Sequence, residues 1–180
     1  MAKNKILKIC FDRVLEGNAQ AEARRLAVEE NTDNAGVMPS GGLPGFGGDI
    51  TGVALKRCLW KPGRVLRVRF LDGDPRVQAK VIAIAKEWEK FANIRFIFGS
   101  DPDAEIRVSF MADRGSWSFC GTDCLTIPKD RPTLNLGWLQ ISTANEEYNR
   151  VVLHEFGHAL GLAHEHQNPA GGMVWNEAAV

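Results

Sequence analysis

The sequence predicts an α+β fold, in which a twisted mixed sheet packs with two long helices and the second helix carries a metal-binding motif. Segments with the two-residue alternation of half-buried strands are interleaved with segments that have helical spacing. At 180 residues and 44% hydrophobic content, the chain is long enough to bury one sizeable core. We therefore expect an N-terminal helix and Gly-rich linker over residues 1–52 and one folded domain over residues 53–180.

The first elements follow from turn-forming residues as much as from hydrophobic spacing. A helix is expected over Ala19–Glu30, and the next segment, Asn31–Gly52, has the Gly, Pro, Asn and Asp content of an extended linker. Arg64–Leu71 alternates as a half-buried strand. Asp74 then caps a helix that has proline at its first position and runs to about Ala92. The apolar residues of this helix recur at helical spacing and are expected in the core: Val77, Val81, Ile84, Ala85, Trp88 and Phe91.

The second half of the chain continues with short strands and a final helix. Strands are expected at Ile94–Phe98, at Glu105–Met111 and, more briefly, at Thr133–Leu136, and the second has its apolar residues Ile106, Val108 and Phe110 on one face. Thr143 and Glu146 have the spacing of a capping box, which predicts where the final helix begins. Its buried face, opposite the metal-binding residues, is expected to consist of Tyr148, Val152, Phe156 and Ala159.

The strongest functional signal is the spacing H-E-x-x-H-x-x-G-x-x-H over residues 154–164. His154 and His158 lie one helical turn apart, so both imidazoles can reach a single ion from one face of the helix. Gly161 can adopt the left-handed conformation that ends a helix, which allows the chain to return with His164. Three histidine ligands leave one position of a tetrahedral zinc open for water, as in catalytic zinc sites.

The same motif contains a candidate catalytic base. Glu155 follows the first ligand and is expected to take a proton from a zinc-activated water and deliver it to the leaving amine of a peptide bond. The alternatives are a surface glutamate on an ordinary helix or a fourth ligand, and the preference of catalytic zinc for three protein ligands argues against the latter. His166 exceeds the ligand count and is expected to face solvent.

Composition restricts the partners and the compartment. With a net charge of zero, the chain lacks the excess of positive charge that is typical of proteins that bind nucleic acid or an anionic membrane. No secretory signal is visible, because Lys8 and Asp12 interrupt the N-terminal apolar run, so the cytoplasm and export by another route both remain open. For the four cysteines, the sequence is compatible with two alternatives, which are two disulfides and free thiols. These residues are Cys10, Cys58, Cys120 and Cys124.

The motif, followed by Glu165, resembles the H-E-x-x-H-x-x-G-x-x-H-E sequence of astacin-type metzincin peptidases. Ser116–Gly121 is similar to the C-W-S-Y-V-G stretch of astacins, and Trp175-Asn176 stands where they carry an I-x-W-x-N element. The resemblance runs from about Leu59 to the end of the chain and points to a bacterial or fungal relative. It implies a zincin-like catalytic domain, a zinc cofactor and a peptide or protein substrate.

The chain departs from the astacin pattern in two places. Ser116 replaces the cysteine that precedes the tryptophan in astacins, so the disulfide pattern of the family is not transferred. Metzincins also place a methionine turn beneath the zinc, and in astacins it lies well beyond the third histidine, whereas this chain ends at Val180. We therefore expect a C-terminally truncated domain, with Met173 as the alternative candidate for the turn.

Two further expectations come from the resemblance. A peptide substrate is expected to pair with an exposed strand edge at Gly115–Gly121, so Trp117 and Phe119 are candidate substrate-binding residues, with core packing as the alternative. Phe46–Asp49 resembles the F-x-G-D motif of astacin propeptides, whose aspartate takes the fourth zinc position. Asp49 is therefore a candidate zinc latch and residues 1–52 a propeptide-like segment, with an ordinary Gly-rich loop as the alternative.

The sequence as a whole predicts a zinc-dependent metalloendopeptidase in which His154, His158 and His164 hold the metal and Glu155 is the general base. One alternative is a zinc-binding pseudo-enzyme or inactive fragment, which the missing methionine turn supports. Another is an interaction module with structural zinc, which the open three-histidine ligand set argues against.

Overall fold

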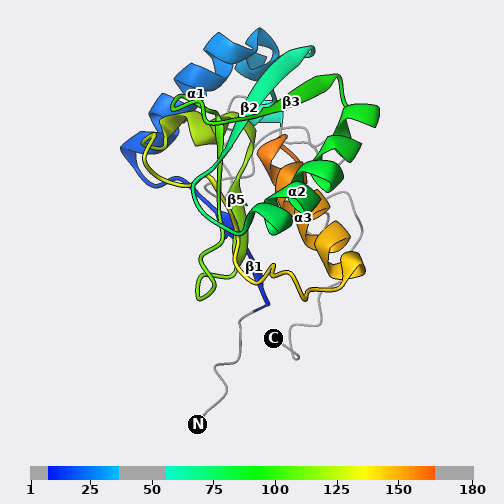
Figure 1. Ribbon diagram of the computed structural model, residues 1–180. Coiled ribbons are helices and arrows are strands. Elements are labelled where there is room, and N and C mark those ends of the chain that lie inside the picture. The colour runs from blue at the N-terminus through cyan, green and yellow to red at the C-terminus, as the bar shows by residue number, and fades with distance from the viewer. Residues whose placement is uncertain (1–7, 37–55, 165–180) are drawn as a thin grey trace, which may run out of the picture.

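The computed structural model describes residues 8–36 and 56–164, and Figure 1 shows how their helices and strands are arranged. Within these residues, six strands form one mixed sheet in the order β1-β5-β6-β4-β2-β3. β5 and β6 are antiparallel, and the other neighbouring strands are parallel. The strands are β1 (Cys10–Arg13), β2 (Arg64–Phe70), β3 (Ile94–Phe98), β4 (Ile106–Ser109), β5 (Ser116–Phe119) and β6 (Leu134–Leu136).

Two long helices pack together beside this sheet, as predicted. α2 contacts α3, and α3 also contacts β5 and β6, so the sheet supports the helix that carries the metal-binding motif (Figure 1). No helix in the described ranges is long and apolar enough to cross a membrane. The α-helices are α1 (Asn18–Glu30), α2 (Pro75–Ala85) and α3 (Asn145–Ala159), and the 3-10 helices are η1 (Thr32–Gly36), η2 (Lys56–Cys58), η3 (Lys86–Lys90) and η4 (Gly121–Thr126).

The unit formed by β2 and α2 follows local sequence rules. Leu66 and Val68 alternate inward along β2 and are fully buried, while their neighbours are partly exposed. The Asp74 carboxylate accepts a hydrogen bond from the backbone N–H of Arg76 at 2.8 Å, and Pro75 occupies the first helical position. The predicted start of the helix is confirmed.

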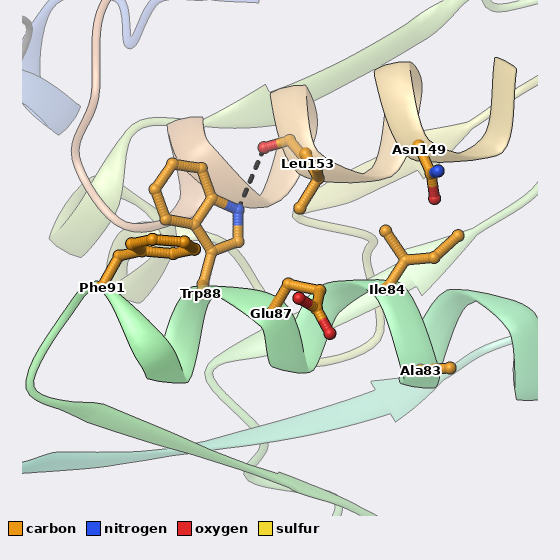
Figure 2. A pocket seen from close by; sticks show the side chains of 7 residues that line it. All are labelled: Ala83, Ile84, Glu87, Trp88, Phe91, Asn149 and Leu153. Atoms are coloured by element: carbon orange, nitrogen blue, oxygen red, sulfur yellow. Dashed lines mark hydrogen bonds between the residues drawn. The ribbon is translucent and has the colours of Figure 1, made fainter. Parts of the chain in front are cut away.

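The predicted end of this helix is only partly correct. The α-helix stops at Ala85 and continues as the tighter η3 to Lys90, so Phe91 lies beyond the last helical turn. Phe91 is 82% exposed, and its prediction as a core residue is wrong, because helical spacing no longer sets its direction. Figure 2 shows Phe91 beside Trp88 at the rim of an apolar groove between the two long helices. The other residues lining this groove are Ala83, Ile84, Glu87, Asn149 and Leu153.

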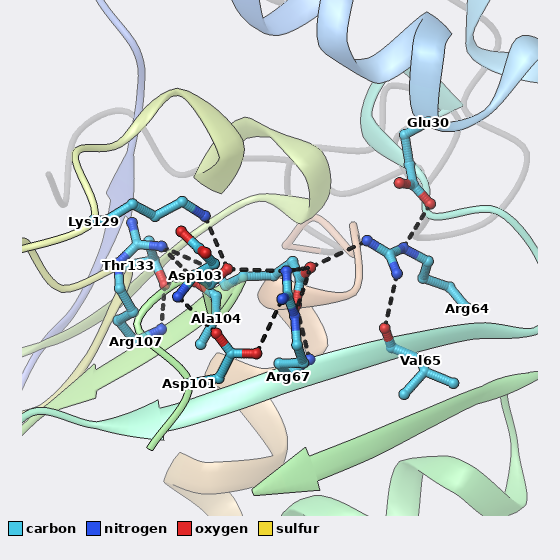
Figure 3. A network of polar contacts seen from close by, with 11 residues as sticks. Glu30, Arg64, Val65, Arg67, Asp101, Asp103, Ala104, Arg107, Lys129 and Thr133 are labelled. Atoms are coloured by element: carbon cyan, nitrogen blue, oxygen red, sulfur yellow. Dashed lines mark hydrogen bonds and ion pairs between the residues drawn. The ribbon is translucent and has the colours of Figure 1, made fainter. Parts of the chain in front are cut away.

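β4 is buried on both faces, whereas the sequence predicted one apolar face. Ile106 and Val108 join the hydrophobic core, and Arg107 on the opposite face is also fully buried. Its guanidinium donates to the backbone carbonyls of Arg131 at 2.7 Å and Ala104 at 2.8 Å, among others. Figure 3 shows Arg107 in a polar layer with Arg64 and Arg67.

The start of α3 differs from the predicted capping box. The residue before the helix is Ala144, and no side chain caps the first turn. The Thr143 hydroxyl instead accepts a hydrogen bond from the backbone N–H of Gln140 at 3.0 Å and lies 3.4 Å from the carbonyl of Trp138, while Glu146 is exposed. The turn that precedes the helix therefore competes successfully for the Thr143 side chain.

Candidate metal centre and active site

α3 separates a packing face from a metal-facing side. Its predicted buried face is confirmed, since each of its four side chains lies in the core: Tyr148, Val152, Phe156 and Ala159. His154, Glu155 and His158 come from the adjoining turns of the same helix. His154 is partly exposed, His158 is buried, and Glu155 is fully buried.

Gly161 ends the motif helix and turns the chain, as predicted. The helix finishes at Ala159, and Gly161 has a φ of 102°, a conformation that a residue with a Cβ rarely adopts. The backbone N–H groups of Gly161 and Leu162 donate to the carbonyls of His158 at 2.8 Å and Gly157 at 3.0 Å, which closes the last turn. The chain then runs back far enough for the His164 ring to meet the two rings on the helix.

The three histidines converge on one point. The Nε2 atoms of His154 and His158 are 3.1 Å apart, those of His158 and His164 are 3.2 Å apart, and those of His164 and His154 are 3.0 Å apart. Ligands of a tetrahedral zinc with Zn–N bonds of about 2.0–2.1 Å are separated by about 3.3 Å, so the triangle fits this metal with small adjustment. The structure thus brings these three residues together, as the sequence predicted.

The orientation of the His158 ring is set by the turn that follows the helix. Its Nδ1 lies 2.8 Å from the carbonyl oxygen of Leu162, which can only accept, so Nδ1 carries the proton. In the neutral ring, Nε2 then has its lone pair directed toward the rings of His154 and His164. Hydrogen bonds of this kind fix the tautomer and orientation of metal-ligating histidines.

The helix that carries the histidines is also contacted by Trp88, a residue that the sequence predicted only as core. The indole N–H of Trp88 donates to the carbonyl of Leu153 at 3.1 Å, directly before the first histidine (Figure 2). A Cβ at Gly157 would lie 3.2 Å from the Trp88 ring, so glycine allows the ring to pack closely between the two histidine turns. Trp88 thus connects η3 to the segment of α3 that bears His154 and His158.

Cys10 is a site residue that the sequence did not indicate. The sulfur of Cys10, a ring nitrogen of His154 and a carboxylate oxygen of Glu155 all lie within 4.8 Å of one another. Burial, followed by the neighbouring Glu155 carboxylate, raises the pKa of the Cys10 thiol to about 12. More than one hundred residues separate Cys10 from this helix in the sequence, and no spacing motif marks the thiol as a partner of the histidines.

Cys10 reaches the site because β1 pairs with β5. The two strands are parallel, with Cys10 opposite Ser116 and Phe11 opposite Trp117. The other edge of β5 pairs with β6. The expectation of an exposed edge at Gly115–Gly121 is therefore wrong for this arrangement, since strand pairing between distant segments is invisible in the local pattern.

The two candidate substrate-binding aromatics lie on this covered strand. Trp117 is only 3% exposed, and the Arg13 guanidinium of β1 lies over its ring at 4.2 Å from the centroid. Phe119 is partly buried, packs against the core and meets the Trp117 ring edge-on at 6.0 Å. With β1 in place, both side chains serve packing, and their contact with substrate stays a prediction.

Several sequence predictions fall outside the described residues. They concern the candidate latch Asp49, the residues Glu165 and His166 after the motif, the methionine-turn candidate Met173, and Trp175-Asn176.

The family model for astacin, which describes a peptidase family, matches residues 55–170 of this chain. This range contains the three histidines, Glu155 and both candidate substrate-binding aromatics. Among curated proteins, no significant match was found.

Two solved structures of myroilysin are similar to this chain. One, described as "Structure of myroilysin", has a TM-score of 0.69 and 42% sequence identity over 71% of this chain and 62% of that chain. The other, described as "Crystal structure of myroilysin", has a TM-score of 0.64 and 33% identity over 97% of this chain and 59% of that chain. The present chain thus spans about three fifths of the length of these two proteins.

Proposed function

The chain belongs to the astacin family of peptidases, and on that premise we propose that it is a zinc-dependent metalloendopeptidase with Glu155 as its general base. The observation that carries the proposal is the triangle of Nε2 atoms from His154, His158 and His164, with sides of 3.0 to 3.2 Å. When bound there, zinc supplies a Lewis acid that lowers the pKa of a water molecule and polarises a peptide carbonyl.

Glu155 is suited to the movement of protons at this point. It follows His154 on the helix and is fully buried, so bulk water does not compete for its carboxylate. The carboxylate accepts a proton from the attacking water and then donates it to the nitrogen of the leaving amine. A general base must reach both atoms, and a carboxylate oxygen of Glu155 lies within 4.8 Å of a ring nitrogen of His154, one member of the ligand triangle.

The substrate class we propose is a peptide or protein in extended conformation. Pairing along β5 would supply main-chain hydrogen bonds, and side-chain pockets would then choose the sequence. In the described arrangement β1 occupies this edge, with Trp117 beneath Arg13. Substrate binding by this route therefore requires β1 to leave β5.

We accordingly propose that the form with β1 in place is latent. The Cys10 sulfur lies within 4.8 Å of a ring nitrogen of His154, and a thiolate, which is a preferred zinc ligand, would compete there with water for a bound zinc. β1 at the same time blocks the strand edge that a peptide would use. Asp49 remains the alternative latch that the sequence suggests.

The competing hypothesis is a pseudo-enzyme that binds zinc without cleaving peptides. The chain spans about three fifths of the two myroilysin structures, and a methionine turn is not part of the described residues. A form from which residues 1–52 have been removed distinguishes the two hypotheses. Zinc without cleavage of a broad peptide library supports the pseudo-enzyme, and cleavage that depends on zinc supports the peptidase.

Metal analysis tests the site itself. We expect one zinc per chain in the purified protein, and a sharp loss of zinc affinity in each of the variants His154→Ala, His158→Ala and His164→Ala. Asn149→Ala, on the exposed side of the same helix, is the matched control and retains zinc. Stoichiometric zinc in all three histidine variants would rule out the assignment.

A further inference from the structure

Two cysteines that the proposed chemistry does not use lie in contact. Cys58, in η2, and Cys120, directly after β5, are 62 residues apart in sequence, and their sulfur atoms are 3.3 Å apart. Cys58 is buried, and Cys120 is partly exposed. Both are thiols in the structure.

The backbone around this pair is held in place on both sides. The Arg57 guanidinium forms an ion pair with the buried Asp123 carboxylate at 3.0 Å, which docks η2 onto η4. A Cβ at Gly121 would collide with the carbonyl of Cys58, so glycine is needed for the two segments to approach this closely. The proximity of the two sulfur atoms thus follows from the packing of two fixed segments.

We propose that Cys58 and Cys120 are a disulfide-forming pair, oxidised by a low-molecular-weight disulfide such as oxidised glutathione. The partly exposed Cys120 attacks the S–S bond of the oxidant as a thiolate, forms a mixed disulfide and releases one thiol. Cys58 then displaces the second thiol and forms the bond to Cys120. Two protein thiols are oxidised, one external disulfide is reduced to two thiols, and the two cysteine protons end on these thiols.

Closure requires only a small movement. The sulfur atoms must approach from 3.3 Å to about 2.05 Å, which side-chain rotation can provide when the backbones already lie this close. The other two cysteines have different surroundings. Cys124 is buried in the core cluster, and Cys10 lies beside His154 and Glu155.

The pair also lies beneath the turn that returns the chain to the metal site. The sulfur of Cys120 is 3.8 Å from the carbonyl oxygen of Leu162, the same oxygen that orients His158. A Cβ at Gly161 would lie 3.3 Å from the carbonyl of Cys58, so this turn packs directly on η2. The crosslink would therefore fix the two segments on which the turn that leads to His164 packs. This part of the proposal rests on the proposed zinc site.

The crosslink is tested on the full chain equilibrated with oxidised or with reduced glutathione. After alkylation and digestion, the oxidised sample is expected to contain a Cys58–Cys120 linked peptide and alkylated Cys10 and Cys124. Its Tm is expected to exceed that of the reduced sample by roughly 10 °C, because the bond closes a long loop. Four alkylated cysteines in the oxidised sample, or a different pairing, would overturn the proposal.

Variants separate the crosslink from a general effect of oxidation. Cys58→Ser and Cys120→Ser are each expected to abolish the linked peptide and the Tm difference, and Cys124→Ser is expected to keep both. The mass map of the parent protein decides the pairing even where a variant fails to fold.

The effect on the metal site has its own measurement. The rate at which a chelator removes zinc is expected to be several-fold lower for the oxidised protein, and equal rates would refute the anchoring of the turn. Absence of zinc from both forms would refute the proposed metal site instead, and the linked peptide would still decide the disulfide.

Discussion

Two polar centres in this domain, one fully buried and one partly exposed, differ in how their polar atoms are used. Arg107 in β4 is fully buried, and its guanidinium donates to several backbone carbonyls at 2.7 to 3.3 Å. At the histidine centre, three Nε2 atoms face one another, and His158 already donates its ring proton to Leu162. The first centre pairs donors with acceptors from its own chain, while the second brings three ring nitrogens together in an arrangement that suits a cation.

This difference distinguishes structural from functional burial of polar groups. A buried donor with enough acceptors stabilises the fold and needs nothing from outside. Ring nitrogens that converge beside a buried carboxylate, Glu155, instead mark a candidate functional site. Substitutions at the first centre should therefore change stability, and substitutions at the second should change chemistry.

The largest effect is expected from Arg107→Met. The substitution leaves several buried carbonyls without their donor, so the free energy of unfolding should fall by about 3–5 kcal/mol. Urea denaturation measures this change, with Arg95→Met on exposed β3 surface as the control. Zinc content of the folded fraction should be unchanged. A loss below about 1 kcal/mol would contradict the assignment of Arg107 as a structural centre.

Glu155→Gln should lower activity, whereas Arg107→Met should lower stability. Peptide cleavage by the form without residues 1–52 is expected to fall about 100-fold or more, equivalent to about 2.7 kcal/mol in the barrier, because the proposed general base is lost. Zinc stoichiometry should be retained, since the ligands are intact. Glu146→Gln, exposed in the first turn of the same helix, is the control and should keep full activity. Undiminished cleavage by Glu155→Gln would remove the residue from the mechanism.

Cys10→Ser tests the proposed latch at the same centre. In the full chain, weaker binding of residue 10 at the metal site should raise peptide cleavage about tenfold, which corresponds to about 1.4 kcal/mol. Val14→Ser, a highly exposed position just after β1, is the control for damage to the segment. Activation by Asp49→Ala with none from Cys10→Ser would assign the latch to Asp49 instead.

Trp88→Phe should have a small effect on stability, and Trp88 contacts the helix that carries the histidines. It removes the hydrogen bond to the carbonyl of Leu153 and keeps most of the ring contact at Gly157, so the free energy of unfolding should fall by about 1 kcal/mol. Phe91→Ser, at an exposed position on the same groove, should change it by no more than about 0.5 kcal/mol. Equal losses in the two variants would show that the groove as a whole, and not the indole hydrogen bond, supports α3.

The parts of the site that could be predicted from sequence are those set within a few residues. The spacing of His154 and His158 follows from the helical repeat, and the return of His164 follows from the positive φ of Gly161. The cap at Asp74 is local in the same sense. Thr143 shows the limit of such rules. Its hydroxyl accepts a hydrogen bond from the backbone N–H of Gln140 in the preceding turn and does not cap α3.

The sequence by itself determined the candidate ligand set, the candidate base, the α+β class and the resemblance to astacins. Only the tertiary structure placed Cys10 beside His154, covered β5 with β1, buried Arg107 among carbonyls and brought Cys58 against Cys120. The physical reason is the range of the interactions. Helix periodicity and turn conformation act over a few residues, whereas strand pairing and side-chain packing join segments whose separation along the chain leaves no trace in local spacing.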